Sequence, residues 1–304
     1  TVTGMGRGAG NARTEDLAIE IAEQRGKKIN LVPLMALLNN YFKPMLDKYA
    51  WGSNPYYYLA GKYGIHPTYI QEMLGDSRYD EEDILTVIEH LRNNIDSEQF
   101  NINMLDGARH FYVGRPKGSW CPAEAMEDRD VLLLGSGPGV ARHHKALEDY
   151  VRRSKPVVIA LNTQTGISGD LIDMRAACHP VRILADCEAY SDLSQPLIVP
   201  ASMLPDEVKQ SLSGTLLLDY GLCVQANSFV FHKTYAILPT SLVVAYALAV
   251  VTSGKASRIL LAGFDGYGAD DPRSQEMQTL FECYSGTSNA LPLLAVTPTG
   301  YGQH

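Results

Sequence analysis

The chain has 304 residues, of which 45% are apolar and 20% charged, and its formal net charge is −8. This length supplies apolar side chains for two hydrophobic cores, so two domains are expected. The negative charge argues against a nucleic-acid-binding protein, because phosphate contacts need clustered Lys and Arg.

Two further observations bear on where in the cell the protein is located. The apolar stretch 242–251 has about half the length that a membrane span needs, so it predicts a buried core helix. Nothing at the start resembles a signal peptide, and the five cysteines are odd in number and lack C-x-x-C spacing. A cytoplasmic location is therefore expected. The cysteines are Cys121, Cys178, Cys187, Cys223 and Cys283.

The chain opens on a glycine-rich turn, "TVTGMGRGAGNARTE". Gly4, Gly6 and Ala9 satisfy the loose G-x-G-x-x-A form of a dinucleotide-binding turn. Such a turn requires a complete preceding strand and a βαβ unit, and neither is present here. This turn is therefore not predicted to hold a phosphate.

Residues 15–92 are helical in character. Thr14 is the expected N-cap and Gly26 the expected C-cap of a first helix, and the next helix is expected to break near Pro44. The absence of any strand pattern predicts a small all-helical subdomain within 1–98. The expected helices cover 14–26, 31–49, 54–64, 66–74 and 79–94.

Residues 99–128 predict a linker, because they mix Gly, Pro and isolated aromatic residues without periodicity. After it, short apolar runs alternate with segments of helix length, which predicts an α/β domain at 129–304 with a Rossmann-like, mainly parallel sheet and helices on both faces. The expected strands are 130–135, 156–162, 215–220, 258–264 and 292–298, and the expected helices are 140–153, 203–212, 240–253 and 272–284.

A second glycine turn, Gly135–Gly139, lies between the first of these strands and its helix. Backbone N–H groups and the positive end of a helix make this position a candidate anion site. Val140 stands where a dinucleotide turn has its third glycine, so NAD is not expected. The alternative is a tight strand-to-helix turn that binds nothing.

Polar residues follow other expected strands and would share one rim of a doubly wound sheet. Asn162 closes the second strand, and Thr240 and Ser241 are expected to cap the apolar helix. Asp265 could accept a hydrogen bond from a sugar hydroxyl. Arg273 could either face a ligand beside Tyr267 or pair with Asp270 or Asp271.

The segments "LLLGSGPGV", "VVIALN" and "PTSLVVAYALAVVTSGKASRILLAGFDGY" are similar to the Rossmann-like domain shared by bacterial sialyltransferases, flagellin-glycosylation accessory proteins and archaeal 6-hydroxymethylpterin diphosphokinase. The resemblance covers about 128–284 and implies binding of a nucleotide or nucleotide sugar. The turn of those families reads G-x-G-P-S, so Gly139 removes a hydroxyl. By resemblance the pocket residues are Gly135, Gly137, Pro138, Asn162, Thr240, Ser241, Gly263 and Asp265; the strand-end pattern adds Ser136, Gly139, Tyr267 and Arg273.

The sequence shows no identifiable general base. His143, His144, His179 and His232 are candidates by residue type only, and a structural role is the alternative for each. The catalytic residues are therefore left unassigned.

The first part of the chain resembles a different family. "GMGRGAGNARTEDL" and "WGSNPYYYLAGKYGIHPTYIQEML" look like the end of the 4-hydroxy-2-oxovalerate aldolase family, in the HMG-CoA lyase-like superfamily. There a glycine-rich turn follows the last strand of a TIM barrel, and a helical extension follows it; Tyr49, Tyr56, Tyr57 and Tyr58 are candidates for its role. The resemblance implies a C-terminal part of a longer aldolase, whose divalent metal would lie in the remaining barrel, since the chain contains no H-x-H.

These resemblances leave three hypotheses. The first is a domain that binds, and could transfer, a nucleotide-linked sugar in bacterial surface-carbohydrate synthesis. The second is a non-catalytic docking or channelling module for the aldolase barrel. The third is pterin pyrophosphoryl transfer, which needs magnesium, for which Asp265, Asp270 and Asp271 are the nearest clustered acids. No cofactor is evident in this chain, and the expected partners are the small-molecule ligand, the barrel and a second copy of the chain.

Overall fold

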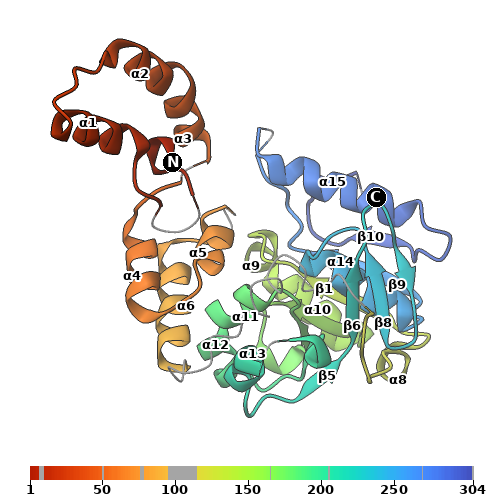
Figure 1. Cartoon of the computed structure of the whole chain (residues 1–304). Helices are drawn as coiled ribbons and strands as arrows, with labels where there is room; N and C mark the ends of the chain where they lie inside the picture. The colour runs from red at the N-terminus through yellow and green to blue at the C-terminus, as the bar shows by residue number, and fades with distance from the viewer. Residues whose placement is uncertain are drawn as a thin grey trace. The chain divides into compact units, whose positions relative to one another are not determined.

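The computed structural model of the protein describes residues 1–6, 10–49, 51–75, 79–94, 115–164, 166–204, 206–268 and 270–302. The predicted linker lies partly outside these residues. The chain divides into two compact units, Thr1–Ala108 and Arg109–His304, which we describe separately (Figure 1).

The described residues of the first unit form helices and the turns between them but no strand, as the sequence predicts. Pro55 and Pro67 each occupy the first position of a helix, and the Asn54 side chain caps one of them by accepting the Tyr57 N–H at 2.9 Å. The elements are η1 (Val2–Gly4), α1 (Thr14–Gln24), α2 (Leu31–Leu37), η2 (Leu38–Phe42), α3 (Lys43–Tyr49), α4 (Pro55–Tyr63), α5 (Pro67–Leu74) and α6 (Glu81–Asn94).

Two local predictions for this unit are wrong. Arg13, not Thr14, is the N-cap of α1, so Thr14 is the first helical residue, and Gly26 follows the C-cap with φ +62°. The chain does not break at Pro44, because η2 is a π-helical segment that joins α2 to α3. A proline lacks the N–H of a regular helix and crowds the preceding turn, and the wider π turn before Pro44 accommodates it.

The opening segment is not a strand. Its described residues form η1, and the Glu15 carboxylate accepts the Thr3 N–H at 2.9 and 3.0 Å. The Asn11 N–H donates to the Gly4 carbonyl at 3.0 Å. The segment therefore folds back on the start of α1, instead of presenting an extended edge to another strand.

The second unit is an α/β domain with a seven-stranded sheet of order β10-β9-β1-β2-β3-β4-β5, in which every neighbouring pair is parallel. This confirms the Rossmann-like fold. The strands are β1 (Asp130–Leu134), β2 (Val157–Leu161), β3 (Met174–Ala176), β4 (Leu197–Val199), β5 (Leu217–Asp219), β9 (Arg258–Ala262) and β10 (Leu293–Ala295).

All five predicted strands are present, whereas β3, β4 and a second sheet were not predicted. That sheet has the order β6-β8-β7, formed by β6 (Gly221–Val224), β7 (Val230–Phe231) and β8 (Tyr235–Leu238). The helical elements of this unit are α8 (Ala123–Met126), α9 (Gly139–Arg142), α10 (His144–Ser154), η3 (Gly169–Leu171), α11 (Pro180–Ala185), α12 (Cys187–Asp192), η4 (Ala201–Met203), α13 (Asp206–Ser211), α14 (Val243–Ser253) and α15 (Pro272–Ser285).

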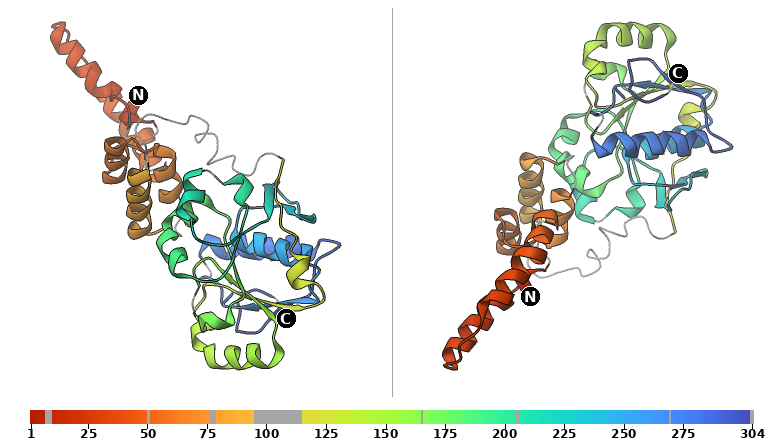
Figure 2. Two further views of the ribbon diagram at one scale, coloured as in Figure 1. Left: turned by 90° about the horizontal axis from the view of Figure 1, so that it is seen from below. Right: turned by 90° about the horizontal axis from the view of Figure 1, so that it is seen from above.

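Helices cover both faces of the large sheet, as predicted. One core cluster joins alternate strand residues such as Leu133 and Ile159 to α14 and α15, and the other joins Leu132 and Val158 to α10. Figure 2 shows α10 on one side of the sheet and the blue helices on the other. The apolar stretch 242–251 forms most of α14, whose Ala245–Thr252 segment is buried throughout.

Candidate functional site

The centre of the sheet has the topology of a ligand site. β1 pairs with β2 on one side and β9 on the other, so the connections after β1 and after β9 leave the sheet at a topological switch point. Gly135, Asn162 and Gly263 directly follow the carboxyl ends of these three strands. In open α/β sheets this crevice is where ligands bind. The structure therefore brings these three predicted residues to one rim.

The Gly135–Gly139 turn packs directly on the backbone that follows β9. The Gly135 N–H donates to the Ala262 carbonyl at 2.8 Å, and the Gly137 N–H donates to the Gly263 carbonyl at 2.9 Å. A Cβ at Gly137 would lie 2.5 Å from that same carbonyl oxygen, and a Cβ at Gly135 would lie 2.7 Å from it. Close backbone approach is therefore the reason for both glycines.

The Asp265 carboxylate occupies the place where the sequence predicts a bound anion. The Gly139 N–H, at the start of α9, donates to Asp265 Oδ2 at 3.0 Å. A Cβ at Gly139 would lie 2.8 Å from each carboxylate oxygen. This contact favours glycine at position 139, because a serine side chain there would displace the carboxylate.

Gly139 and Asp265 should therefore show thermodynamic coupling. We expect Gly139→Ser to lower the free energy of unfolding by about 2 kcal/mol and Asp265→Ala by about 1 kcal/mol, through crowding and the lost N–H acceptor respectively. The double variant should lose less than their sum, since alanine at 265 makes room for the serine. Urea unfolding of the four proteins measures this difference, and strict additivity would contradict the assigned contact.

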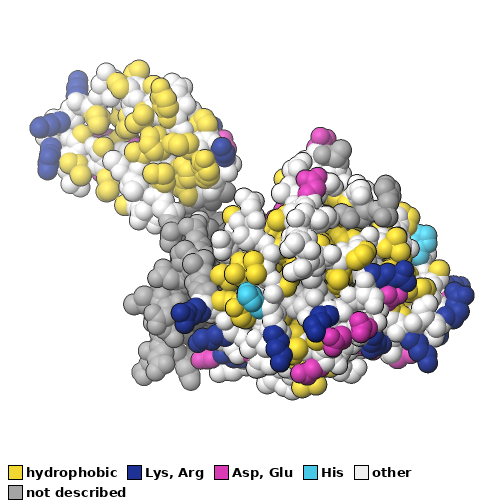
Figure 3. Space-filling model, turned by 90° about the vertical axis from the view of Figure 1, so that its right-hand side faces the viewer, with side chains coloured by type: hydrophobic (Ala, Val, Ile, Leu, Met, Phe, Trp, Pro, Cys, Tyr) yellow, Lys and Arg dark blue, Asp and Glu magenta, His cyan; other side chains and the backbone are white. Residues whose placement is uncertain are grey.

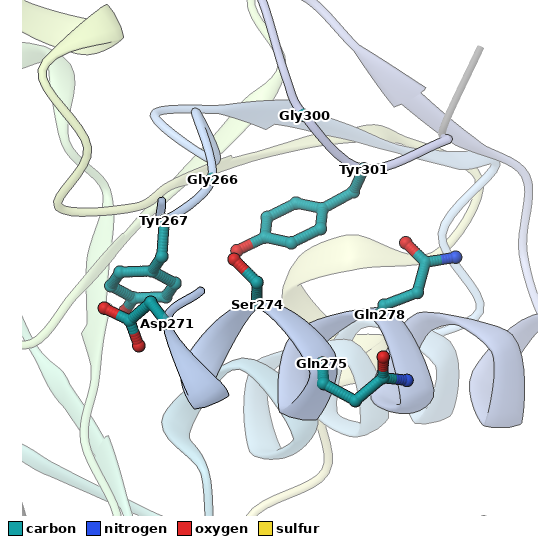
Figure 4. A pocket seen from close by; sticks show the side chains of 8 residues that line it. All are labelled: Gly266, Tyr267, Asp271, Ser274, Gln275, Gln278, Gly300 and Tyr301. Atoms are coloured by element: carbon teal, nitrogen blue, oxygen red, sulfur yellow. The ribbon is translucent and has the colours of Figure 1, made fainter. Parts of the chain in front are cut away.

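A cavity of about 240 Å³ lies beside Asp265, over the start of α15 (Figure 4). Its volume is below the range of about 300–1,000 Å³ typical of drug-sized ligands, so it suits a single ring. Figure 4 shows the Tyr301 and Ser274 hydroxyls pointing toward each other inside it. The lining residues are Gly266, Tyr267, Asp271, Ser274, Gln275, Gln278, Gly300 and Tyr301.

One wall of the cavity carries a fixed charge pair. The Arg273 guanidinium binds the Asp271 carboxylate, with Nη2 2.6 Å from Oδ2 and Nε 3.0 Å from Oδ1, and it lies 4.3 Å from the centre of the Tyr267 ring. Asp271 also caps α15 by accepting the Arg273 N–H at 2.9 Å. This confirms the predicted alternative in which Arg273 pairs with Asp271. The pair holds the Tyr267 ring at the cavity.

Tyr301 contributes a protonated hydroxyl. Burial raises the pKa of Tyr301, and the nearby Tyr267 phenol raises it further, while the Tyr267 N–H, which donates to the hydroxyl, opposes the shift. At neutral pH the group therefore remains a donor as well as an acceptor. The Phe281 ring supports it from behind, with ring centres 5.4 Å apart.

The remaining predicted site residues do not line this cavity. Ser136 is exposed, and Pro138 is the N-cap residue of α9. Thr240 and Ser241 do not cap α14, whose N-cap is Leu242, because the chain turns into the helix after them. The Ser241 carbonyl instead accepts the Cys178 S–H at 3.2 Å, close to the end of β3.

The structure also shows the surroundings of the four candidate histidines and of the candidate magnesium ligands. His144 contacts the Ala141 carbonyl through Nδ1, 2.8 Å away, and His232 stacks on Tyr235; His143 is exposed and His179 is the N-cap residue of α11. Within the described residues, no group of three or more His, Cys, Asp or Glu side chains could hold a metal ion. The predicted magnesium cluster of Asp265, Asp270 and Asp271 is therefore not formed, because Asp265 binds Gly139 and Asp271 binds Arg273.

Several cavity residues were not predicted. Ser274 and Gln278 are one helical turn apart on α15, a spacing that places them on the same face as Gln275, but the pattern alone does not mark that face as a cavity. Gly300 and Tyr301 come close to Gly266 only through the fold: the Gly300 N–H donates to the Asp265 carbonyl at 2.9 Å.

The fold and this rim define a Rossmann-like α/β domain with a small cavity beside its switch point. No protein-family model matches the sequence, and no curated protein matches it. Among solved structures, the chain is similar to the MAf glycosyltransferase from Magnetospirillum magneticum AMB-1, with 14% identity and a TM-score of 0.39, over 64% of this chain and 33% of that one. The chain thus spans about a third of that protein's length, and a likeness this distant carries no argument about function.

Two findings bear on the compartment. Among the helices of the described residues, none is both long and apolar enough to cross a membrane. The five cysteines, all within the described residues, form no disulfide, and burial raises the pKa values of Cys178 and Cys187. The cytoplasmic location stays a prediction.

Proposed function

We propose that the second unit binds a nucleotide-linked sugar at the carboxyl rim of its sheet, with one ring of the ligand in the cavity between Tyr267 and Tyr301. The observation that carries this proposal is the composition of that cavity. Two tyrosine rings offer flat apolar faces, and Ser274, Gln275 and Gln278 offer hydrogen-bonding groups suited to the hydroxyls of a sugar or the edge of a base.

The position of the cavity supports the same proposal. It adjoins the Asp265 backbone, whose carbonyl accepts the Gly300 N–H, at the switch point of the sheet. We do not place the phosphates of the ligand at the glycine turn, since the Asp265 carboxylate already accepts the Gly139 N–H. The nucleotide-sugar assignment agrees with the sequence resemblance of the second unit.

Calorimetric titration of the full chain with CMP-, UDP- and GDP-linked sugars tests the proposal. We expect saturable binding of one nucleotide class in the micromolar range, near −8 kcal/mol. Titration with the matching free nucleotide and the free sugar then identifies which part enters the cavity. The absence of binding to every nucleotide sugar would overturn the proposal.

A docking or channelling module is the second candidate, favoured by the surface of α1, α2 and α3. In Thr1–Tyr49 the described buried residues are only Gly4 and Glu15, and Figure 3 shows hydrophobic side chains gathered on this part of the first unit. The exposed ones include Leu17, Ile21, Val32, Met35, Tyr41 and Tyr49. Turnover of a nucleotide sugar that Asp265→Ala abolishes would exclude a purely docking role for the chain.

The aldolase origin of the first unit stays a prediction, carried by the resemblance of its sequence alone, and so does a role in surface-carbohydrate synthesis. Pterin pyrophosphoryl transfer is not proposed, because the described acids do not form the magnesium cluster that this reaction needs.

A further inference from the structure

The helices α1, α2 and α3 of the first unit have no hydrophobic core of their own. None of the residues of α2, η2 and α3 is buried, and Glu15 is the only buried residue of α1. The helices α4, α5 and α6 of the same unit differ, because Ile70, Met73 and Val87 are at most 1% exposed. The segment from α1 to α3 therefore leaves its apolar side chains in contact with solvent.

We call the large, exposed apolar side chains of Thr1–Tyr49 the hairpin face. Because such residues expose about half of roughly 200 Å² each, the face offers about 1,000 Å². A monomer rarely exposes more than a few hundred Å² of contiguous apolar surface, whereas a stable interface buries about 800 Å² per partner. The hairpin face is thus large enough for a partner protein. Its members are Met5, Leu17, Ile21, Ile29, Leu31, Val32, Met35, Leu37, Tyr41, Met45 and Tyr49.

The exposed charges of α1 and of the turn after it are separated by sign along the chain. Acidic residues lie within the helix, and basic residues follow its end. The bases are held at that end, because the Lys27 N–H donates to the Ala22 carbonyl at 2.8 Å and Gly26 has φ +62°. The helix therefore has a negative part and a positive end beside the hairpin face. The acids are Asp16, Glu20 and Glu23, and the bases are Arg25, Lys27 and Lys28.

This order of charges is complementary to its own copy in the antiparallel orientation. Asp16 and Lys27 are about 16 Å apart along the helix direction, and Ile21 and Ala22 lie midway between them. A two-fold axis beside Ile21 would place Asp16 of one protomer opposite Lys27 of its partner, twice in each dimer. A parallel approach would bring like charges together. An anionic membrane would attract the basic end but repel the acidic part.

We propose that the chain forms a two-fold symmetric dimer, in which the hairpin faces of two protomers pack together with antiparallel α1 helices. Burial of the apolar side chains drives the association, and the charges of α1 set its orientation. A docking or channelling partner would have to displace the second copy from this face. The dimer does not rest on nucleotide-sugar binding by the second unit.

Sedimentation velocity of the full chain at increasing concentration tests the dimer. We expect a reversible change from the 33.4 kDa monomer to a species of twice that mass, with a dissociation constant of about 1 μM or below. A monomer at every concentration up to about 100 μM would overturn the proposal. Cosedimentation of this monomer with phosphatidylglycerol vesicles would then assign the hairpin face to a membrane instead.

Ile21→Asp locates the interface, because it places a carboxylate beside its own copy at the two-fold axis. We expect the dissociation constant of the dimer to rise at least about a hundredfold. Ile21 is 44% exposed, so the monomer should keep its fold and its circular dichroism spectrum. Leu85→Asp, at a 47% exposed position on α6, is the matched control and should remain dimeric. An Ile21→Asp chain that associates like the parent protein would contradict the proposed interface.

An exchange of charges tests the antiparallel orientation. Asp16→Lys and Lys27→Glu each place like charges opposite one another, so each variant alone should dimerise about tenfold more weakly than the parent protein. An equimolar mixture of the two should recover the parent affinity as a mixed dimer, because each lysine then faces an acid. A mixture that associates no better than its components would overturn the antiparallel arrangement.

The dimer and the nucleotide-sugar site can fail independently of each other. Monomeric Ile21→Asp should bind the nucleotide sugar with the affinity of the parent protein, since the substitution lies in the first unit. Tyr267→Ala, in the second unit, should leave the dissociation constant of the dimer unchanged. An altered dimer in Tyr267→Ala would contradict an interface confined to the hairpin face.

Discussion

Replacing Gly137 with alanine is expected to lower the free energy of unfolding of the second unit by about 3 kcal/mol, at the upper end of the usual cost of overpacking. The added Cβ would lie 2.5 Å from the Gly263 carbonyl oxygen. Because that atom belongs to the backbone of the central sheet's rim, it cannot rotate away as a side chain would. Relief requires that the turn separate from β9 and lose the Gly137 N–H hydrogen bond.

Urea unfolding followed by Trp120 fluorescence measures this loss, in a Trp51→Phe background that leaves Trp120 as the only tryptophan. Gly268→Ala is the matched control, since among the described residues no atom beyond its chain neighbours lies within 4 Å of a Cβ built there. It should change the free energy of unfolding by less than about 0.5 kcal/mol. A similar small change for Gly137→Ala would mean that the turn does not pack on β9 as described.

Tyr267→Ala is expected to weaken nucleotide-sugar binding about thirtyfold, equivalent to about 2 kcal/mol. This is the scale measured when an aromatic platform is removed from beneath a stacked ring. Tyr267 is 43% exposed, so its truncation should disturb the fold far less than truncation of Tyr301, which packs on Phe281. Its effect therefore reports on the ligand contact.

Calorimetry with the nucleotide sugar identified in the initial titration gives the dissociation constants. Tyr267→Phe keeps the ring and should bind within about twofold to threefold of the parent protein, because stacking does not need the hydroxyl. Leu216→Ala, at an exposed position on another part of the unit, should leave affinity unchanged. Full affinity in Tyr267→Ala would remove the cavity from the proposed site.

The sequence could predict the strands whose apolar runs are long enough to stand out. β1, β2 and β9 each contain five residues and are buried almost throughout. β3 escaped prediction because it is three residues long and has Arg175 at its centre, so no apolar run is visible. β6 and β8 lie in a separate small sheet, where half of their residues remain only partly buried.

The site could be predicted only where it depends on strand ends. Gly135, Asn162 and Gly263 were found because parallel strands bring their carboxyl ends to one rim. The hydrogen bond between the Gly139 N–H and the Asp265 carboxylate could not be predicted. It depends on the pairing of Leu134 with Ala262, which brings Asp265 to Gly139. The sequence pattern also gives no sign that Arg175, at the centre of β3, is buried.

Because the Asp265 carboxylate binds the glycine turn, the turn does not need a ligand in order to fold. Many phosphate-binding loops gain order when the anion fills their donor groups, and part of the binding free energy is then lost to that ordering. Here the Asp265 carboxylate accepts the Gly139 N–H, so the protein itself supplies the acceptor that holds the turn. A ligand at this rim would meet a preorganised surface, and its binding should leave hydrogen exchange of the turn amides nearly unchanged.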